Sequence, residues 1–118
     1  MISLHVYMTP KANKEGELRA GIRDKWMAAM SEQPGFLRAA LLKPFPSDEL
    51  DKLQAVKPTS TFETVAFWRT EQERQAWVAR PIHDQVFKPL LELADDVSYT
   101  LQTVEHDWNL WPMPVTAP

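Results

Sequence analysis

The stretch FWRTEQERQAWVARPIHDQVFKPLLEL, residues 67–93, decides the fold because it joins the end of a strand to two helical segments. Thr70 and Glu73 have the spacing of a capping box, which begins a helix directly after the strand. Pro81 interrupts this helix, since proline lacks the amide proton and clashes with the preceding turn. A second helical segment then carries apolar residues on one face, namely Ile82, Val86, Leu90 and Leu93. The stretch therefore predicts a strand followed by a broken helix.

The sequence on either side supplies four strands and one more helix. Apolar residues at steps of three and four predict an amphipathic helix over residues 13–32, with Asn13 as its N-cap. Alternating or β-branched patterns predict strands over residues 2–8, 36–43, 61–69 and 97–106. The order β-α-β-β-α-β is that of the split βαβ arrangement of ferredoxin-like domains. The predicted fold class is therefore α+β, with a four-stranded antiparallel sheet.

The same topology predicts a partner. Right-handed crossovers place both helices on one face of the sheet and leave the other face bare. Aromatic side chains on this bare face would expose a large apolar patch in a monomer of 118 residues. Since a two-fold partner is the simplest cover for such a patch, we expect a homodimer in which the two sheets close on each other.

Composition restricts the partners and the compartment. The 13 Lys+Arg and 16 Asp+Glu residues are mixed along the chain and form no basic stripe, which argues against nucleic acid. No apolar stretch approaches the roughly 20 residues of a membrane span. The absence of cysteine excludes disulfides and thiolate chemistry, and it fits a reducing compartment. We therefore expect a cytoplasmic protein that does not bind membranes.

The chain length fits one domain, expected over residues 1–107. Residues 108–118 form a tail with three prolines and two tryptophans, and it follows neither a helical nor a strand period. Because an apolar tail would reduce solubility if it were exposed, we expect it to pack across the partner subunit or over the mouth of a pocket. Residues 44–58, which also contain three prolines, are expected to form an exposed loop with a short helical turn.

Three segments resemble a known family. They are Gln33-Pro34-Gly35-Phe36, the strand end Phe67-Trp68-Arg69-Thr70 running into Glu71 to Trp77, and the region around His83. Together with the element order, they resemble the antibiotic biosynthesis monooxygenase superfamily of dimeric α/β barrels over roughly residues 1–107. Members include cofactor-independent oxygenases that convert anthrone-type aromatic polyketides into quinones, and heme-degrading monooxygenases. The resemblance implies a dimeric barrel that binds a small hydrophobic or aromatic substrate.

Two polar residues of the first strand are the predicted catalytic residues. If Ile2, Leu4 and Val6 pack under the helices, His5 and Tyr7 point toward the barrel interior. A histidine can remove the acidic proton of a phenol or anthrone and leave a carbanion that reacts with O2 without metal or flavin. We therefore predict His5 as the base and Tyr7 as a group that positions a substrate oxygen. The alternative for His5 is a hydrogen-bonded residue at the dimer interface.

Four further residues are predicted to bind substrate. Trp77 matches the helix tryptophan that contacts the macrocycle in heme degraders, although a tryptophan on a helix face also serves as a core anchor. His83 follows it by six residues and either contacts a ligand or only bonds to Asp84. Phe67 and Tyr99 complete the predicted set of substrate-binding residues.

Heme is the alternative cofactor to none. In heme-degrading members the axial histidine lies further along the helix, at the position of Phe87, which cannot ligate iron. The asparagine that these enzymes carry near the end of the first strand is also missing, His5 being the nearest match. The three histidines are far apart and form no metal motif, so no metal site is predicted. The hypotheses are a cofactor-independent monooxygenase, a heme-binding or heme-degrading monooxygenase, and a non-catalytic dimeric domain that binds a small molecule.

Overall fold

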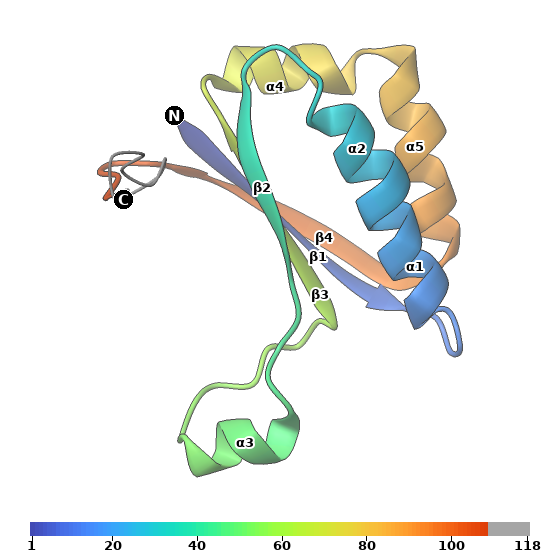
Figure 1. Ribbon diagram of the computed structural model, residues 1–118, viewed down its shortest axis with the longest axis vertical. Helices are drawn as coiled ribbons and strands as arrows, with labels where there is room; N and C mark the ends of the chain where they lie inside the picture. The colour runs from blue at the N-terminus through green and yellow to red at the C-terminus, as the bar shows by residue number, and fades with distance from the viewer. Residues whose placement is uncertain (109–118) are drawn as a thin grey trace, which may run out of the picture.

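A computed structural model describes residues 1–108 as a four-stranded antiparallel sheet with helices packed on one face (Figure 1). The strand order is β2-β3-β1-β4, which confirms the predicted fold class. The bounds of the strands are β1 (Ile2–Pro10), β2 (Phe36–Leu42), β3 (Phe62–Trp68) and β4 (Ala94–Thr103). Most of the tail predicted to pack on a partner lies outside the described residues, and Trp108, its first residue, is exposed.

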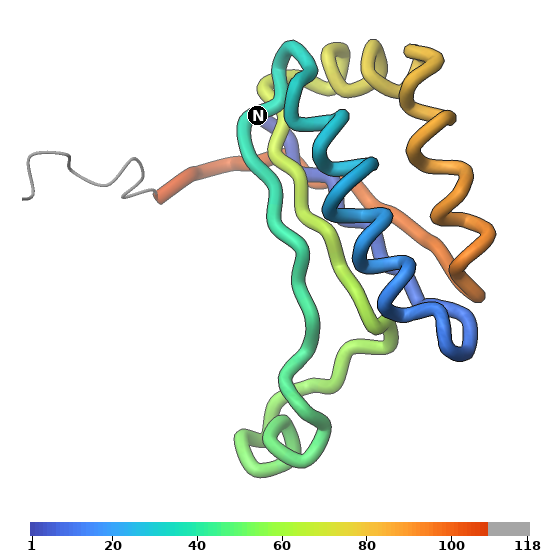
Figure 2. The backbone as a smooth tube through the Cα atoms, turned by 45° about the vertical axis from the view of Figure 1, so that its right-hand side comes forward, coloured from blue at the N-terminus to red at the C-terminus, as the bar shows by residue number. Residues whose placement is uncertain are grey.

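All helices except α3 form a single layer against the sheet. Figure 2 shows the first helical segment and α5 running side by side over it. The helix α3 stands apart, in the connection between β2 and β3, where a short helical turn was predicted (Figure 1). The helical bounds are α1 (Glu15–Gly21), a π-helical turn η1 (Ile22–Trp26), α2 (Met27–Met30), α3 (Ser47–Lys52), α4 (Glu71–Val78) and α5 (Pro81–Glu92).

The core lies between the helices and the sheet. Every second residue of β1 faces the helices, and Leu4, Val6 and Met8 are buried there. From the helix layer, a buried row with four-residue spacing meets them: Leu18, Ile22, Trp26 and Met30. Trp26 and Trp68 are at most 2% exposed, so both belong to the core.

The structure confirms the Thr70 half of the predicted capping box at the start of α4, whereas the Glu73 carboxylate bonds to other groups than the Thr70 amide. The Thr70 hydroxyl accepts a hydrogen bond from the Glu73 amide at 3.1 Å, as an N-cap does. The Glu73 carboxylate accepts from the Arg69 guanidinium at 2.9 Å and from the Thr70 hydroxyl, so the helix start is tied to the strand end. Pro81 stands at the first turn of α5, where its missing amide proton costs nothing, and so separates the two helices as predicted.

Two predicted boundaries are wrong. Asn13 is not an N-cap, because its φ of 64° places it in a turn and α1 begins only at Glu15. The fourth strand begins at Ala94 and ends at Thr103, earlier than the predicted residues 97–106. Pairing of Asp96 with Thr9 and of Ala94 with Pro10 extends this strand, with Asp95 left unpaired at a register shift, although aspartates rarely occur in strands.

Gly35 should tolerate no side chain. Its φ of 89° is rare for other residues, and an added Cβ would lie 2.6 Å from Glu73 Cβ. We expect Gly35→Ala to lower the free energy of unfolding in urea by about 1–3 kcal/mol. Gly16→Ala is the control, because a Cβ on this helical glycine meets nothing within 4 Å and should raise stability slightly. Equal effects of the two variants would contradict the strained turn.

Candidate functional site

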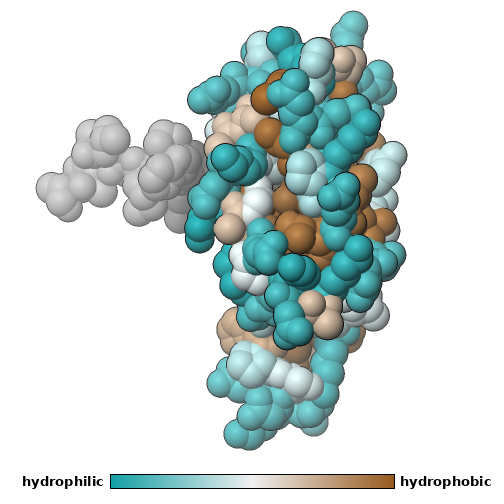
Figure 3. All heavy atoms as spheres, turned by 90° about the vertical axis from the view of Figure 1, so that its right-hand side faces the viewer, coloured by the Kyte–Doolittle hydropathy of each residue, from teal (hydrophilic) through white to brown (hydrophobic). Residues whose placement is uncertain are grey.

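A cavity of about 320 Å³ opens between the helices and the sheet. Its floor comes from β1 and β4, and its walls come from α4 and α5. Figure 3 shows an apolar patch, surrounded by hydrophilic side chains, on the helix side of the molecule. We call this cavity the helix-side pocket; the side chains used below are Arg74, Trp77, His83, Phe87 and Tyr99.

Among residues 1–108, His83 is the only histidine that lines the helix-side pocket. The first turn of α5 carries it, and its ring stacks on Phe87 with centroids 5.4 Å apart and an interplanar angle of 28°. The edge of Trp77 meets the same ring at 5.2 Å. These aromatic contacts hold the imidazole in one orientation against the pocket.

A carboxylate sets which ring nitrogen of His83 carries the proton. The Nδ1 atom lies 3.2 Å from Asp84 Oδ1, and the hydrogen bond from His83 lowers the pKa of Asp84 below its ordinary value. Since an ionised carboxylate only accepts hydrogen bonds, Nδ1 carries the proton in this pair. In the neutral ring, Nε2 then holds the lone pair and can accept a proton from a bound molecule.

Arg74 and Tyr99 place polar groups on the apolar lining. The Arg74 side chain is only 13% exposed and donates two hydrogen bonds to Glu71, at 2.6 and 2.7 Å. These bonds lower the pKa of Glu71 and raise that of Arg74. Tyr99 comes from β4 and is mostly exposed, so its ring forms the outer part of the wall. A cation and a phenol hydroxyl are thus available to an oxygen atom of a bound molecule.

The lowered pKa of Glu71 predicts an acid-dependent loss of stability. A carboxyl group with a depressed folded-state pKa contributes stability above its unfolded value of 4.5, and this contribution disappears as pH falls through the folded value. Between about pH 5 and pH 3, wild type should therefore lose more free energy of unfolding in urea than Glu71→Gln. The difference should stay below about 1 kcal/mol because Glu71 is partly exposed. Parallel pH profiles would show that the Arg74 contact does not stabilise the fold.

The six predicted site residues fall into two groups on opposite faces of the sheet. Trp77, His83 and Tyr99 line the helix-side pocket together. His5, Tyr7 and Phe67 alternate with buried residues of β1 and β3, so they lie on the open face, as was expected for His5 and Tyr7. Within one chain, neither His5 nor Tyr7 shares a pocket with Trp77. A substrate held by Trp77 would therefore not be in contact with His5 or Tyr7 of the same chain.

The open face is more polar than expected. At its centre, Ser3 Oγ lies 2.9 Å from His5 Nε2, and His5 Nδ1 lies 3.0 Å from Glu63 Oε2. Phe67 is covered by the Arg38 guanidinium at 5.1 Å from its ring centroid. The expectation of a large aromatic patch is therefore wrong for the described residues, because hydrogen-bonded polar side chains occupy the central strands.

Sequence reasoning missed three polar residues. Arg74 lies three positions before Trp77 on α4, and this helical spacing was a usable signal for a shared face. Ser3 shares a strand face with His5 by simple alternation. Glu63 could not be found in this way, because its place depends on the register between β3 and β1.

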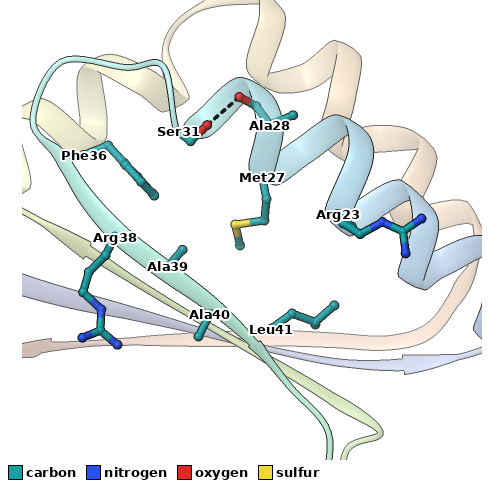
Figure 4. A pocket seen from close by; sticks show the side chains of 9 residues that line it. All are labelled: Arg23, Met27, Ala28, Ser31, Phe36, Arg38, Ala39, Ala40 and Leu41. Carbon is teal, nitrogen blue, oxygen red and sulfur yellow. Dashed lines mark hydrogen bonds between the residues drawn. The ribbon is translucent and has the colours of Figure 1, made fainter. Parts of the chain in front are cut away.

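A second cavity, of about 590 Å³, lies between α2 and the edge strand β2 (Figure 4). The Ser31 hydroxyl at its rim already donates to the Ala28 carbonyl at 2.8 Å, and Arg23 pairs with Asp24. Among the described residues, no histidine or carboxylate lines this cavity. Apart from Arg38, the rest of its wall is apolar and includes Met27, Phe36, Ala39 and Leu41. It therefore offers space without acid–base groups, and the helix-side pocket is the better candidate site.

Residues 1–108 contain neither a metal-binding cluster nor a helix that could span a membrane. No three histidine or acidic side chains among them are grouped so that they could hold a metal ion. No helix in this part of the chain has the length and apolar character needed to cross a membrane.

These features define a small α+β domain with an apolar pocket under its helices. The chain belongs to the antibiotic biosynthesis monooxygenase family, whose model matches residues 1–89. A search of curated proteins finds no match.

Solved structures agree with the fold. SnoaB from Streptomyces nogalater, described as a cofactor-independent oxygenase, is 18% identical, with a TM-score of 0.71 over 90% of this chain and 94% of its own. A protein from Deinococcus radiodurans, described as a putative antibiotic biosynthesis monooxygenase, is 17% identical, with a TM-score of 0.71 over 92% of this chain and 97% of its own. A dimeric ferredoxin-like protein of unknown function from Thermobifida fusca is 11% identical, with a TM-score of 0.68 over 87% and 90%. At these identities the likeness shows the fold alone.

The heme alternative gains no support from these findings. Phe87, which stands where the resemblance places an axial ligand, packs on His83 inside the pocket.

Proposed function

We propose that the protein is a monooxygenase that oxidises a small aromatic or polyketide-like substrate with O2 and without a cofactor. The observation that carries this proposal is the apolar helix-side pocket with one oriented histidine, His83, among aromatic side chains. Family membership and the fold shared with SnoaB support the reaction class. The substrate class follows from the lining, because flat aromatic rings stack well on Phe87 and Trp77.

The chemistry needs only a base and stabilisation of negative charge. His83 Nε2 takes a proton from an activated methylene of an anthrone-type substrate, and the resulting enolate oxygen accepts hydrogen bonds from Arg74 or Tyr99. The electron-rich carbanion then reduces O2. In the overall reaction the methylene becomes a carbonyl, one oxygen atom enters the product and the other leaves as water. We assign the base to His83 rather than His5, because only His83 shares a pocket with Trp77 and Tyr99.

We also propose that the protein forms a homodimer through the open face of its sheet. No helix of residues 1–108 covers this face, and the dimeric ferredoxin-like protein from Thermobifida fusca has the same fold. Light scattering should give a mass near twice the 13.6 kDa of the chain. A mass of one chain across a range of protein concentrations would contradict the dimer.

Oxygen uptake tests the proposed activity. Purified protein should accelerate O2 consumption by anthrone above the spontaneous rate, with one O2 consumed for each quinone formed and no loss of rate in a metal chelator. With labelled O2, the quinone should carry one labelled oxygen. Heat-unfolded protein is the control for nonspecific catalysis. Saturable quenching of tryptophan fluorescence by anthrone without oxygen uptake would contradict the enzyme and favour a binding domain.

A further inference from the structure

A second group of reactive side chains lies on the open face, across the sheet from the helix-side pocket. Ser3 and His5 are two positions apart on β1, so alternation puts both on this face. Glu63 joins them from β3, where the register sets His5 opposite Val65 and Tyr7 opposite Glu63. The result is a continuous chain of three side chains, with contacts of 2.9 and 3.0 Å.

The order of atoms along these two hydrogen bonds gives each of the three residues a role. Glu63 contacts His5 Nδ1, and an ionised carboxylate can only accept, so Nδ1 carries the proton. In the neutral imidazole, Nε2 is then the acceptor, and the group within reach of it is the Ser3 hydroxyl. A hydroxyl bonded to a base that is itself oriented by a carboxylate is the arrangement that activates serine for nucleophilic attack.

A cavity of about 440 Å³ beside Ser3 and His5 offers space for a substrate. Ser3, His5 and Phe67 form part of its wall, and Gln102 of β4 lies directly across from Ser3 in the β1–β4 register. Directly opposed residues of an antiparallel pair bring their side chains within about 5 Å of each other. The Gln102 amide is therefore placed to donate to an oxyanion that forms beside Ser3.

We propose that Ser3, His5 and Glu63 form a second catalytic site that hydrolyses small acyl esters. Ser3 Oγ attacks the ester carbonyl while its proton passes to His5 Nε2, and the C–O bond to the alcohol breaks as His5 returns this proton to the leaving oxygen. Water then attacks the acyl-Ser3 ester, again giving its proton to His5, and releases the carboxylic acid and free Ser3. The net reaction converts one ester and one water into one acid and one alcohol, with no oxidant or metal.

The burial of Ser3 restricts the substrate. Its exposed fraction is 5%, so an acyl group must enter the cavity beside Phe67 to reach the hydroxyl. If two open faces close on each other in a homodimer, the cavity lies between subunits. Both conditions favour short acyl groups such as acetyl over long chains.

The experiment uses p-nitrophenyl acetate with the full-length protein. We expect a burst of p-nitrophenol equal to the concentration of chains, acetylation of Ser3 in quenched samples by peptide mass spectrometry, and slower steady turnover. Ser3→Ala should abolish the burst. Ser98→Ala is the matched control, since Ser98 lies on the same face opposite Tyr7 but outside the hydrogen-bonded chain, and it should keep the burst.

Glu63→Gln tests the positioning role of the carboxylate. Because the amide can turn its donor toward Nδ1 and favour the wrong tautomer, the acylation rate should fall by about 100-fold, while the concentration of ester at half-maximal rate stays the same. A purely structural role would instead change folding and affinity together. The proposal is overturned if Ser3→Ala retains the burst, or if acetylation occurs only at lysines in folded wild-type protein. Loss of this activity leaves oxygen uptake at the helix-side pocket intact, so the two functions fail separately.

Discussion

Replacement of His83 by alanine is expected to lower the rate of oxygen uptake with anthrone by about 100-fold or more, because a positioned general base contributes this much to a proton transfer. The protein should remain folded, since His83 packs at the surface end of the pocket and its only side-chain hydrogen bond in the described residues is to exposed Asp84. Oxygen-electrode rates across pH, with unfolding curves on the same samples, give both readouts.

Two further variants sharpen this test. Gln85→Ala removes an exposed residue of the same helix outside the pocket and should leave the rate unchanged. His5→Ala tests the residue predicted from the sequence as the base. If His5→Ala stops oxygen uptake and His83→Ala does not, the oxygenase site lies on the open face and the assignment to the helix-side pocket is wrong.

Trp77→Ala should cause the largest loss of stability, about 3–5 kcal/mol in urea or thermal unfolding. Trp77 is 1% exposed and belongs to the core, yet it also forms one wall of the helix-side pocket. Its removal leaves a void that α4 and α5 cannot close without losing the contact between Trp77 and His83. Substrate binding should therefore weaken together with stability.

Trp108→Ala provides the control for removing a tryptophan, because Trp108 is 88% exposed and its loss should change stability by less than about 0.5 kcal/mol. Trp77→Phe separates packing from the specific contact. It should recover much of the stability, since a phenyl ring fills part of the same space. A loss below about 1 kcal/mol for Trp77→Ala would show that α4 is not anchored by this side chain.

The topology was predictable because its signals are local. The capping residue Thr70, the break at Pro81 and the alternation in β1 each act over a few positions, and all three appear in the structure. Asn13 shows where such signals mislead. Asparagine favours N-caps, but it also tolerates positive φ, and here the turn before α1 uses this second property.

The candidate site was predictable only in part. Trp77 and His83 could be grouped from the sequence because they lie close together on consecutive helices. Their separation from His5 depends on which face of the sheet the helices cover, and the alternation of β1 indicates this only once the buried set, Leu4 and Val6, is known. The contact of Glu63 with His5 joins residues 58 positions apart, so no local pattern reveals it.

The π-helical turn η1 has a consequence for insertions and deletions. The buried row from Leu18 to Met30 advances by four residues at each step, which exceeds one α-helical turn by about 40°. The wider turn, in which the Met27 amide bonds to the Ile22 carbonyl, takes up this excess and keeps Trp26 over the sheet. Deletion of one residue from η1 would leave a regular α-helix, in which the eleven remaining steps from Leu18 to Met30 turn through about 1,100°, within about 20° of three full turns, so both side chains would still face the sheet. The helix can therefore lose one residue at η1, whereas an added residue would rotate Met30 by about 100° away from the core. The connection around α3, which stands away from the sheet, can lengthen or shorten without disturbing the pocket.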